Sequence, residues 1–237
     1  MKIRIKSGEE LEKLLDALAN DIVDANVYYR LFTGLKSSIE EHSKEVGQSN
    51  TFWSLGMQAI KDAYLFRLCR IFDQNAKTLN LVNLLDTIKS NLQFFQETHF
   101  KERLKGNAFV DSLAEGVKIP SPEELQADIE FAGRTNPIVR KLMVWRGNAY
   151  AHKGAQIALG KTGSLEPISK EEFELLLDKC FSIFNKYLQL YKATTWSRQV
   201  IGHDDYESLF KFLRLGLEKY QADLQKEIDS GQPSSGT

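Results

Sequence analysis

The sequence lacks most features of a secreted or membrane-spanning protein. Only two cysteines occur among 237 residues, Cys69 and Cys180, and both lie in apolar patterns with helical spacing. Two cysteines in so long a chain do not form a disulfide framework, so we expect reduced core thiols and a reducing compartment. No stretch approaches the roughly 18 apolar residues of a membrane span, and the opening MKIRIKSGEE has no apolar signal segment. These absences predict a soluble cytoplasmic protein.

The chain also lacks net charge, because 31 basic residues face 32 acidic ones and the formal charge is −1. Attraction for nucleic acid would therefore have to come from a local patch. Residues 131–165 contain no Asp or Glu, although the same window holds Arg134, Arg140, Lys141, Arg146, Lys153 and Lys161. Two interpretations remain open: a basic surface that attracts phosphate, or cations that pair with acidic residues elsewhere in the fold.

Several sequence patterns that carry chemistry are missing. The phosphate-binding and nucleophile motifs G-x-x-x-x-G-K-[ST], G-x-G-x-x-G and G-x-S-x-G do not occur. His99 and Glu102 have an H-x-x-E spacing, but no further ligands accompany them. We therefore expect neither a metal site nor a cofactor. No alternating strand pattern and no internal repeat is visible either.

Sequence signals of helices, by contrast, occur along most of the chain. Ser7 with Glu10 and Ser169 with Glu172 have capping-box spacing, and Ser121-Pro122 and Asn136-Pro137 are typical helix starts. We expect helices over about 8–35, 51–72, 81–88, 92–104, 121 onward, 137 onward, 169–192 and 205–228, and a short helix within a loop over 106–120. Gly34 is a plausible weak point. The prediction is an all-α chain of six to eight helices, with one domain over 1–228 and a disordered tail over 229–237.

The stretch WRGNAYAHK, Trp145–Lys153, closes the helix that starts at Pro137. Arg146 and His152 suffice together for metal-free RNA cleavage, with one group moving a proton and the other stabilising phosphate charge. On a regular helix, however, six residues amount to about 600° of rotation and about 9 Å of rise, so the two side chains would point about 120° apart. They converge only if the helix ends or distorts, or if two subunits share the site. A histidine that caps the helix is the simpler interpretation of spacing alone.

The same stretch resembles the R-x4–6-H motif of HEPN-domain proteins, with five residues between Arg146 and His152. A second segment, AYLFRLCRIFDQNAKTLNLVNLLDTI (Ala63–Ile88), is similar to a region of the abortive-infection AbiU-like HEPN family. The resemblance implies an antiparallel helical bundle with an HEPN-like four-helix core and additional helices, a homodimer, and an RNA substrate. It further implies a metal-independent endoribonuclease in phage defence or a toxin–antitoxin system, with an antitoxin or defence protein as partner.

Carried over residue by residue, the resemblance makes Arg146 the group that stabilises phosphate charge and His152 the group that transfers a proton. The family commonly has asparagine directly after the arginine, whereas this chain has Gly147 there and Asn148 one position later. Either Asn148 supplies the amide to the catalytic site from a shifted position, or that contact is lost. Loss would make the chain a degenerate HEPN module that binds RNA or a partner protein.

Other residues complete the predicted site. Arg140, Lys141, Tyr150 and Lys153 are the candidate RNA contacts, because they place charge and one aromatic ring around Arg146. Trp145 is expected in the core. The first interpretation of Asp73 is a turn or capping residue. Arg67 and Arg70 pair with Asp73 or Asp62, or else face the cleft, and the sequence does not decide between these.

Overall fold

The computed structural model describes residues 3–150, residue 159 and residues 165–231. Within these ranges the chain forms helices and no strand, which confirms the all-α class. Eight helices correspond to predicted ones: α1 (Gly8–Glu41), α3 (Asn50–Ile71), α4 (Leu81–Lys89), α5 (Glu97–Arg103), α7 (Pro122–Ala132), α8 (Pro137–Trp145), α10 (Lys170–Lys192) and α11 (Tyr206–Ser230). A ninth, α6 (Val110–Ala114), is the short helix expected within 106–120, whereas the five-residue helix α2 (Ser43–Gly47) was not predicted. The α-helices in these ranges number ten, above the predicted six to eight. No helix there is long and apolar enough to cross a bilayer.

The helix starts follow from local hydrogen bonds. The Ser121 hydroxyl accepts a bond from the Glu124 amide at 3.2 Å, and the Asn136 side chain accepts one from the Ile138 amide at 2.9 Å. At the start of α10 the predicted capping box is complete, because Ser169 and Glu172 each accept the other's backbone N–H. These side chains satisfy amides that have no partner within the helix.

Two helix predictions were wrong in detail. α1 does not weaken at Gly34 but continues to Glu41, and a Cβ at Gly34 would collide with the Tyr206 hydroxyl. The glycine therefore serves the close approach of two helices. The segment expected as one helix over 92–104 is a 3-10 helix, η1 (Leu92–Phe95), followed by α5, because Gln96 between them is extended.

By its internal contacts the chain divides into two compact units. The larger unit comprises Met1–Asn26 and Asp62–Gln199, and the smaller unit comprises Val27–Lys61 and Val200–Thr237. Both α1 and α3 contribute residues to both units. The candidate catalytic segments all belong to the larger unit.

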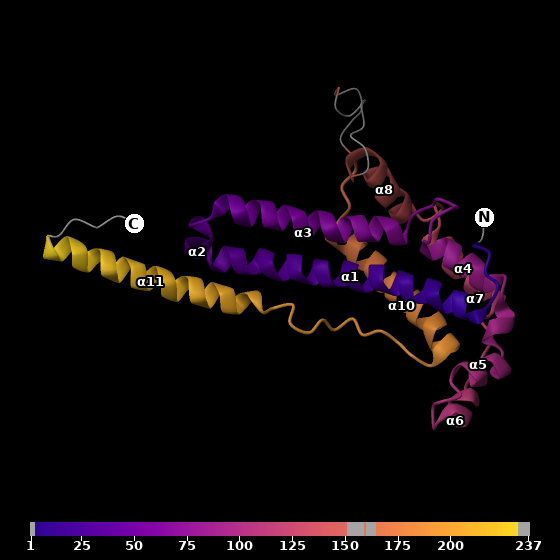
Figure 1. Cartoon of the computed structure of the whole chain (residues 1–237). Helices are drawn as coiled ribbons and strands as arrows, with labels where there is room; N and C mark the ends of the chain where they lie inside the picture. Colours follow the sequence, from indigo (N-terminus) through magenta and orange to yellow (C-terminus); the bar gives the residue numbers. More distant parts are fainter. Residues whose placement is uncertain (1–2, 151–158, 160–164, 232–237) are drawn as a thin grey trace. The chain divides into compact units, whose positions relative to one another are not determined.

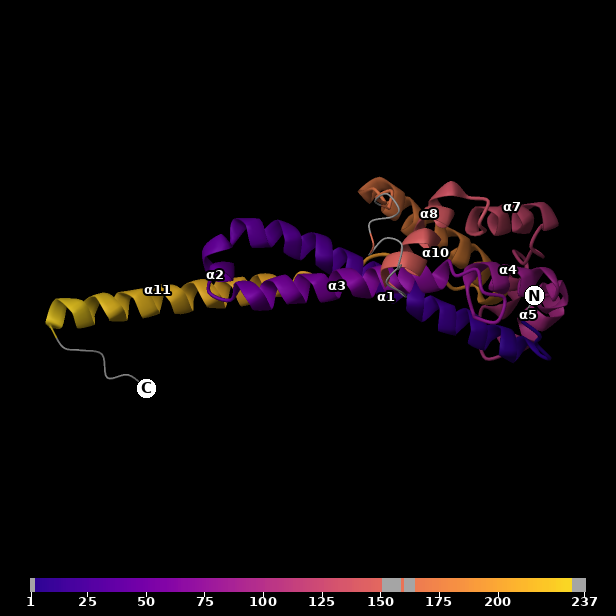
Figure 2. The ribbon, with the colours of Figure 1, turned by 90° about the horizontal axis from the view of Figure 1, so that it is seen from above.

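The core of the larger unit is built around α10, which packs against α8 and α5, while α4 packs against α7 (Figures 1 and 2). The buried residues of α10 are Phe173, Leu176, Leu177, Cys180, Phe181, Ile183, Phe184, Tyr187, Leu188 and Tyr191. The buried tyrosines have partners for their hydroxyls: Tyr187 donates to Asp128 and Tyr191 donates to the Gly8 carbonyl, both at 2.6 Å. Buried polar groups are thereby satisfied without loosening the core.

The smaller unit has its own core around Phe210 of α11. The Phe210 ring is fully buried between the rings of His42 and Trp53, with centroid distances of 4.5 and 5.1 Å. Leu35 and Val46 complete the buried part of the cluster. In this unit α1 and α3 run in opposite directions and are joined through α2 (Figure 1).

Candidate functional site

The helical geometry changes at Arg146. α8 is regular from Pro137 to Trp145, with Val139 and Leu142 buried, and a π-helical turn, η2 (Arg146–Tyr150), follows it. Single π turns occur frequently at functional sites, and they widen the helix so that the spacing of a regular helix no longer applies. His152 and Lys153 lie outside the described residues, so the convergence of Arg146 with His152 stays a prediction.

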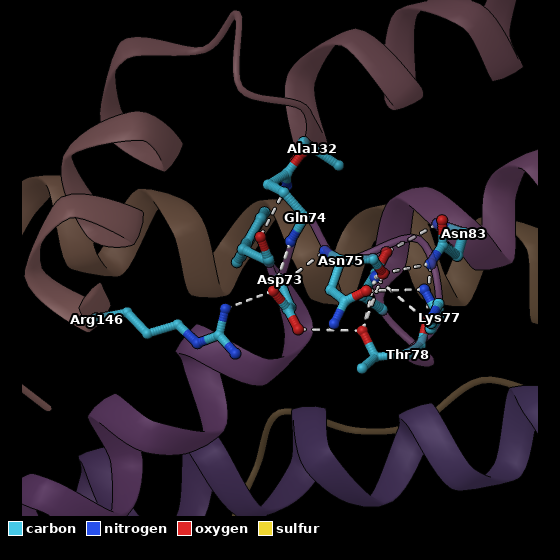
Figure 3. A network of polar contacts seen from close by, with 10 residues as sticks. Asp73, Gln74, Asn75, Lys77, Thr78, Asn83, Ala132 and Arg146 are labelled. Carbon is cyan, nitrogen blue, oxygen red and sulfur yellow. Dashed lines mark hydrogen bonds and ion pairs between the residues drawn. The ribbon is translucent and has the colours of Figure 1, made fainter. Parts of the chain in front are cut away.

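The guanidinium of Arg146 forms an ion pair with Asp73, which is 73 residues earlier in the chain. Nη1 of Arg146 lies 2.5 Å from Oδ1 of Asp73 (Figure 3). The Asp73 side chain is 7% exposed, whereas that of Arg146 is 39% exposed. The pair therefore joins a carboxylate in the protein interior to a cation that still reaches solvent.

Asp73 is held from several other directions as well. Its Oδ1 accepts bonds from the Gln74 and Asn75 amides at 2.8 and 3.2 Å, and its Oδ2 accepts one from the Thr78 hydroxyl at 3.0 Å (Figure 3). The predicted turn role of Asp73 is thus present, and the ion pair is added to it. Four donors on one carboxylate fix its orientation.

The loop that carries Asp73 is anchored by buried amide side chains. Asn80, which is 1% exposed, caps α4 by accepting a bond from the Asn83 amide, and its own side-chain amide donates to the Asn75 carbonyl. The Asn83 side chain donates to the carbonyls of Asn75 and Thr78 at 2.9 and 2.7 Å. Because both amides are buried, the loop between α3 and α4 has a defined conformation.

Gln74 connects this loop to a second helix end. Its side-chain amide donates to the Phe72 carbonyl at the end of α3 and to the Ala132 carbonyl at the end of α7 (Figure 3). α7 is followed after a short turn by α8, which leads to Arg146. The loop therefore contacts the ends of α3 and α7 directly, and it contacts the end of α8 through the ion pair with Arg146.

Cys69 lies one turn before Asp73 and is 1% exposed. Burial raises the pKa of its thiol to about 12, with opposing smaller effects of the Arg146 and Asp73 charges. A thiol with so high a pKa is neutral at physiological pH and is a poor nucleophile. Cys180 is also free and buried, so both cysteines are core residues, as predicted.

Arg67 and Arg70 both pair with carboxylates of α1. Arg67 bridges Asp21 and Asp24 of α1 at 3.0 and 2.9 Å, and Arg70 reaches Asp21 at 3.1 Å. The sequence left open a pairing with Asp73 or Asp62 or a position in the cleft, and the structure gives the carboxylates of α1 as partners. These pairs tie α3 to α1 within the larger unit.

The basic residues of the window 131–165 also differ in whether they pair with a carboxylate. Lys141 is 15% exposed and binds Glu166 and Glu172, each at 2.7 Å, so that this cation, like Arg146, pairs with an acid outside the window. These carboxylates raise the pKa of Lys141. Arg134 and Arg140 are exposed. Pairing therefore explains two of the four basic residues that the structure describes in this window.

The remaining predicted residues lie around the end of α8. Asn148 donates its side-chain amide to the Val144 carbonyl at 2.8 Å, which engages that amide within its own helix. The side chain of Tyr150 lies outside the described part of the chain. Trp145 is not in the core as expected: it is half-buried, and its indole donates to the Glu166 carbonyl. With Arg140 it lines a pocket of about 290 Å³ beside α8.

Sequence reasoning named Asp73 but missed its contact with Arg146. The only signal was that Asp73 lies in the second segment of the resemblance. No spacing rule connects side chains so far apart in the chain, because their distance depends on how α3 and α8 pack.

A protein-family model described as AbiU2, from the HEPN group, matches residues 8–212 of this chain. No curated protein and no solved structure matches it. The matched range begins with α1, ends inside α11, and includes both segments on which the resemblance rests.

Proposed function

The chain belongs to the AbiU2 family of HEPN proteins, and on this premise we propose that it is a metal-independent endoribonuclease acting in phage defence or as a toxin. The family supports a nuclease or abortive-infection role in general terms. The proposal specifies RNA as the substrate, cleavage without a metal ion, and Arg146 and His152 as the catalytic residues. The observation that carries them is the half-exposed Arg146 guanidinium, held by a buried carboxylate at an irregular helix end.

A guanidinium in that position suits a phosphate. It has five N–H donors and stays charged at any useful pH, so it can serve Asp73 through Nη1 and offer other N–H groups to phosphate oxygens. In the proposed reaction the RNA 2′-hydroxyl attacks the adjacent phosphorus, and the 5′-oxygen leaves. Arg146 stabilises the negative charge of the phosphorane. His152 takes the 2′-hydroxyl proton or protonates the 5′-oxygen, and solvent water carries out the other of these two proton transfers.

The surroundings would bind the rest of the RNA. Arg140 is exposed on the same helix, and Lys141, Tyr150 and Lys153 belong to the proposed contact surface. We place the reaction in the cytoplasm and in a homodimer, where two copies of the motif share a cleft. An antitoxin or another defence protein is the proposed regulatory partner.

The test is cleavage of RNA in the presence of EDTA. The substrates are total cellular RNA and a single-stranded RNA oligonucleotide with its all-deoxy counterpart. We expect the wild type to cut both RNA substrates, to leave the deoxy strand intact and to produce 2′,3′-cyclic phosphate ends. Arg146→Ala and His152→Ala should each lose activity by about 100-fold or more.

Arg30→Ala is the matched control, because it removes an exposed arginine of the smaller unit. It should cleave as the wild type does. Cleavage that requires a divalent metal, or full activity in Arg146→Ala, would overturn the proposal.

A second candidate function is a degenerate HEPN module that binds RNA or a partner protein. Gly147 directly after Arg146, together with the engagement of the Asn148 amide by the Val144 carbonyl, favours it. Such a module would bind RNA with equal affinity in the wild type and in His152→Ala, and would cleave at no pH. A gel-shift titration beside the cleavage assay separates the two functions.

A further inference from the structure

Asp73 is a buried carboxylate that points at the proposed catalytic arginine. We propose that Asp73 is a positioning residue, which sets the orientation of the Arg146 guanidinium for a phosphate ligand. This inference rests on the proposed endoribonuclease function and assigns a residue that acts through Arg146 rather than on the RNA itself.

The geometry of the pair supports a positioning role. Asp73 engages Arg146 through Nη1 alone, at 2.5 Å. The guanidinium is planar, so fixing one of its nitrogens on a rigid acceptor restricts the directions in which the other N–H groups point. An arginine at a half-exposed helix end would otherwise sample many rotamers, and ordering it at the moment of binding would cost conformational entropy.

Asp73 is rigid enough for this task. The Gln74 and Asn75 amides and the Thr78 hydroxyl hold both of its oxygens, and the carboxylate is 7% exposed. The loop is in turn held by the buried side chains of Asn80 and Asn83. A chain of hydrogen bonds therefore runs from the start of α4 to the guanidinium, and Figure 3 shows most of it in one view.

The charge of Asp73 has a second consequence. A carboxylate beside Arg146 partly cancels the positive potential that attracts RNA, so the pair would weaken ground-state binding while ordering the group that stabilises the transition state. Removing the charge should consequently lower kcat without weakening the binding of RNA. A residue that only held the fold together would lower both together.

Asp73→Asn is the informative variant. Its carbonyl oxygen can still accept the bonds from Gln74 and Asn75, and its amide can donate to the Thr78 hydroxyl, which itself donates to the Asn75 carbonyl. The loop should therefore keep its conformation while the ion pair is lost. Asp204→Asn, at an exposed aspartate of the smaller unit, is the charge-matched control.

The first measurement is independent of activity. Arginine side-chain NMR, with the Arg146 signals assigned by their disappearance in Arg146→Lys, reports rotation about the Nε–Cζ bond. We expect slow rotation in the wild type and in Asp204→Asn, and fast rotation in Asp73→Asn. Equally fast rotation in the wild type would overturn the positioning role, whether or not the protein cleaves RNA.

The second measurement is cleavage of the RNA oligonucleotide in EDTA. In Asp73→Asn we expect kcat to fall by about 10- to 100-fold, because a misplacement of about 1 Å costs roughly that much. KM should stay equal or decrease. An unchanged or raised kcat, or a parallel loss of kcat, RNA binding and thermal stability, would contradict the inference and leave the nuclease proposal intact. A wild type that cleaves no RNA, with Arg146→Ala equally inert, would instead reject the proposed function and this inference with it.

Discussion

The two units of the molecule each contain an arginine paired with a buried carboxylate, and the pairs differ in their surroundings. In the larger unit Arg146 binds Asp73, and in the smaller unit Arg214 binds Glu45 through Nε at 2.8 Å. The two carboxylate side chains are 7% exposed in both cases, and the two arginines are 39% and 52% exposed. By burial alone the two pairs are nearly the same.

Their neighbours separate them. The Arg214 guanidinium also donates to His42 Nδ1 at 2.7 Å, and the His42 ring stacks on Phe210. Since arginine can only donate, this histidine nitrogen acts as an acceptor. Nε and Nη2 of Arg214 are thus both engaged beside the hydrophobic core around Phe210. Asp73 instead belongs to a polar loop, and the Arg146 that it binds lies at an irregular helix end.

A buried ion pair therefore does not by itself mark a functional site. The two pairs differ in how many guanidinium N–H groups remain available for a ligand. They also differ in whether the carboxylate lies in a polar loop or beside a hydrophobic core. We therefore expect substitutions at the Glu45–Arg214 pair to affect stability, and substitutions at the Asp73–Arg146 pair to affect cleavage.

The largest expected effect concerns the core beside the Glu45–Arg214 pair. Phe210→Ala removes a fully buried ring and should lower the free energy of unfolding by about 3–5 kcal/mol. Phe212→Ala, at a ring that is 67% exposed on the same helix, should change it by about 0.5 kcal/mol or less. Urea unfolding followed by circular dichroism measures both. Similar losses in the two variants would show that Phe210 is not the centre of this core.

The second prediction exchanges each arginine for lysine. Arg146→Lys keeps the charge but loses the planar fork that serves Asp73 and a phosphate together, so cleavage should fall about 10-fold or more. Arg214→Lys should lower the Tm and leave the cleavage rate per folded molecule unchanged. A cleavage loss in Arg214→Lys, or none in Arg146→Lys, would show that the two ion pairs do not differ in function.

The third prediction concerns pH in the smaller unit. The bond from Arg214 holds the pKa of Glu45 below its ordinary value of 4.5. A carboxyl group whose pKa is depressed by folding stabilises the protein above its unfolded pKa, and this contribution disappears as the pH falls through the folded pKa. Glu45→Gln should therefore lower the Tm at pH 7, and the Tm difference from the wild type should shrink below about pH 4.5. A difference that is constant down to pH 3 would refute this assignment.

The smallest expected effect concerns the hydroxyl behind Asp73. Thr78→Val removes its bond to Oδ2 and should cost about 1 kcal/mol of stability, with a smaller decrease in kcat than in Asp73→Asn. Thr33→Val is the control, because the Thr33 hydroxyl donates only to carbonyls of its own helix, those of Tyr29 and Arg30. It should leave cleavage unchanged in the same EDTA assay. Equal kcat values for Thr78→Val and Thr33→Val would show that the hydroxyl has no part in orienting the ion pair.

Much of the fold could be predicted because its signals are local. Ser121, Asn136 and Ser169 cap helices through bonds to amides two or three residues later, and such bonds are encoded in a few neighbouring positions. Gly34 shows the limit of this kind of reasoning. As a residue it predicts a weak helix, yet its function is to admit Tyr206 from a distant helix.

The candidate site likewise combines features with a local sequence signal and contacts between distant residues. The sequence predicted that Arg146 lies in the last part of a helix, in a stretch free of acidic residues, and that Asp73 follows the end of another helix. Helix packing brings Arg146 and Asp73 together, whereas Arg67 and Arg70 pair with carboxylates of α1 and Lys141 pairs with Glu166 and Glu172. The physical reason is that a cation pairs with whichever carboxylate packing brings within a few ångströms, and that distance is a property of helix packing and not of sequence spacing.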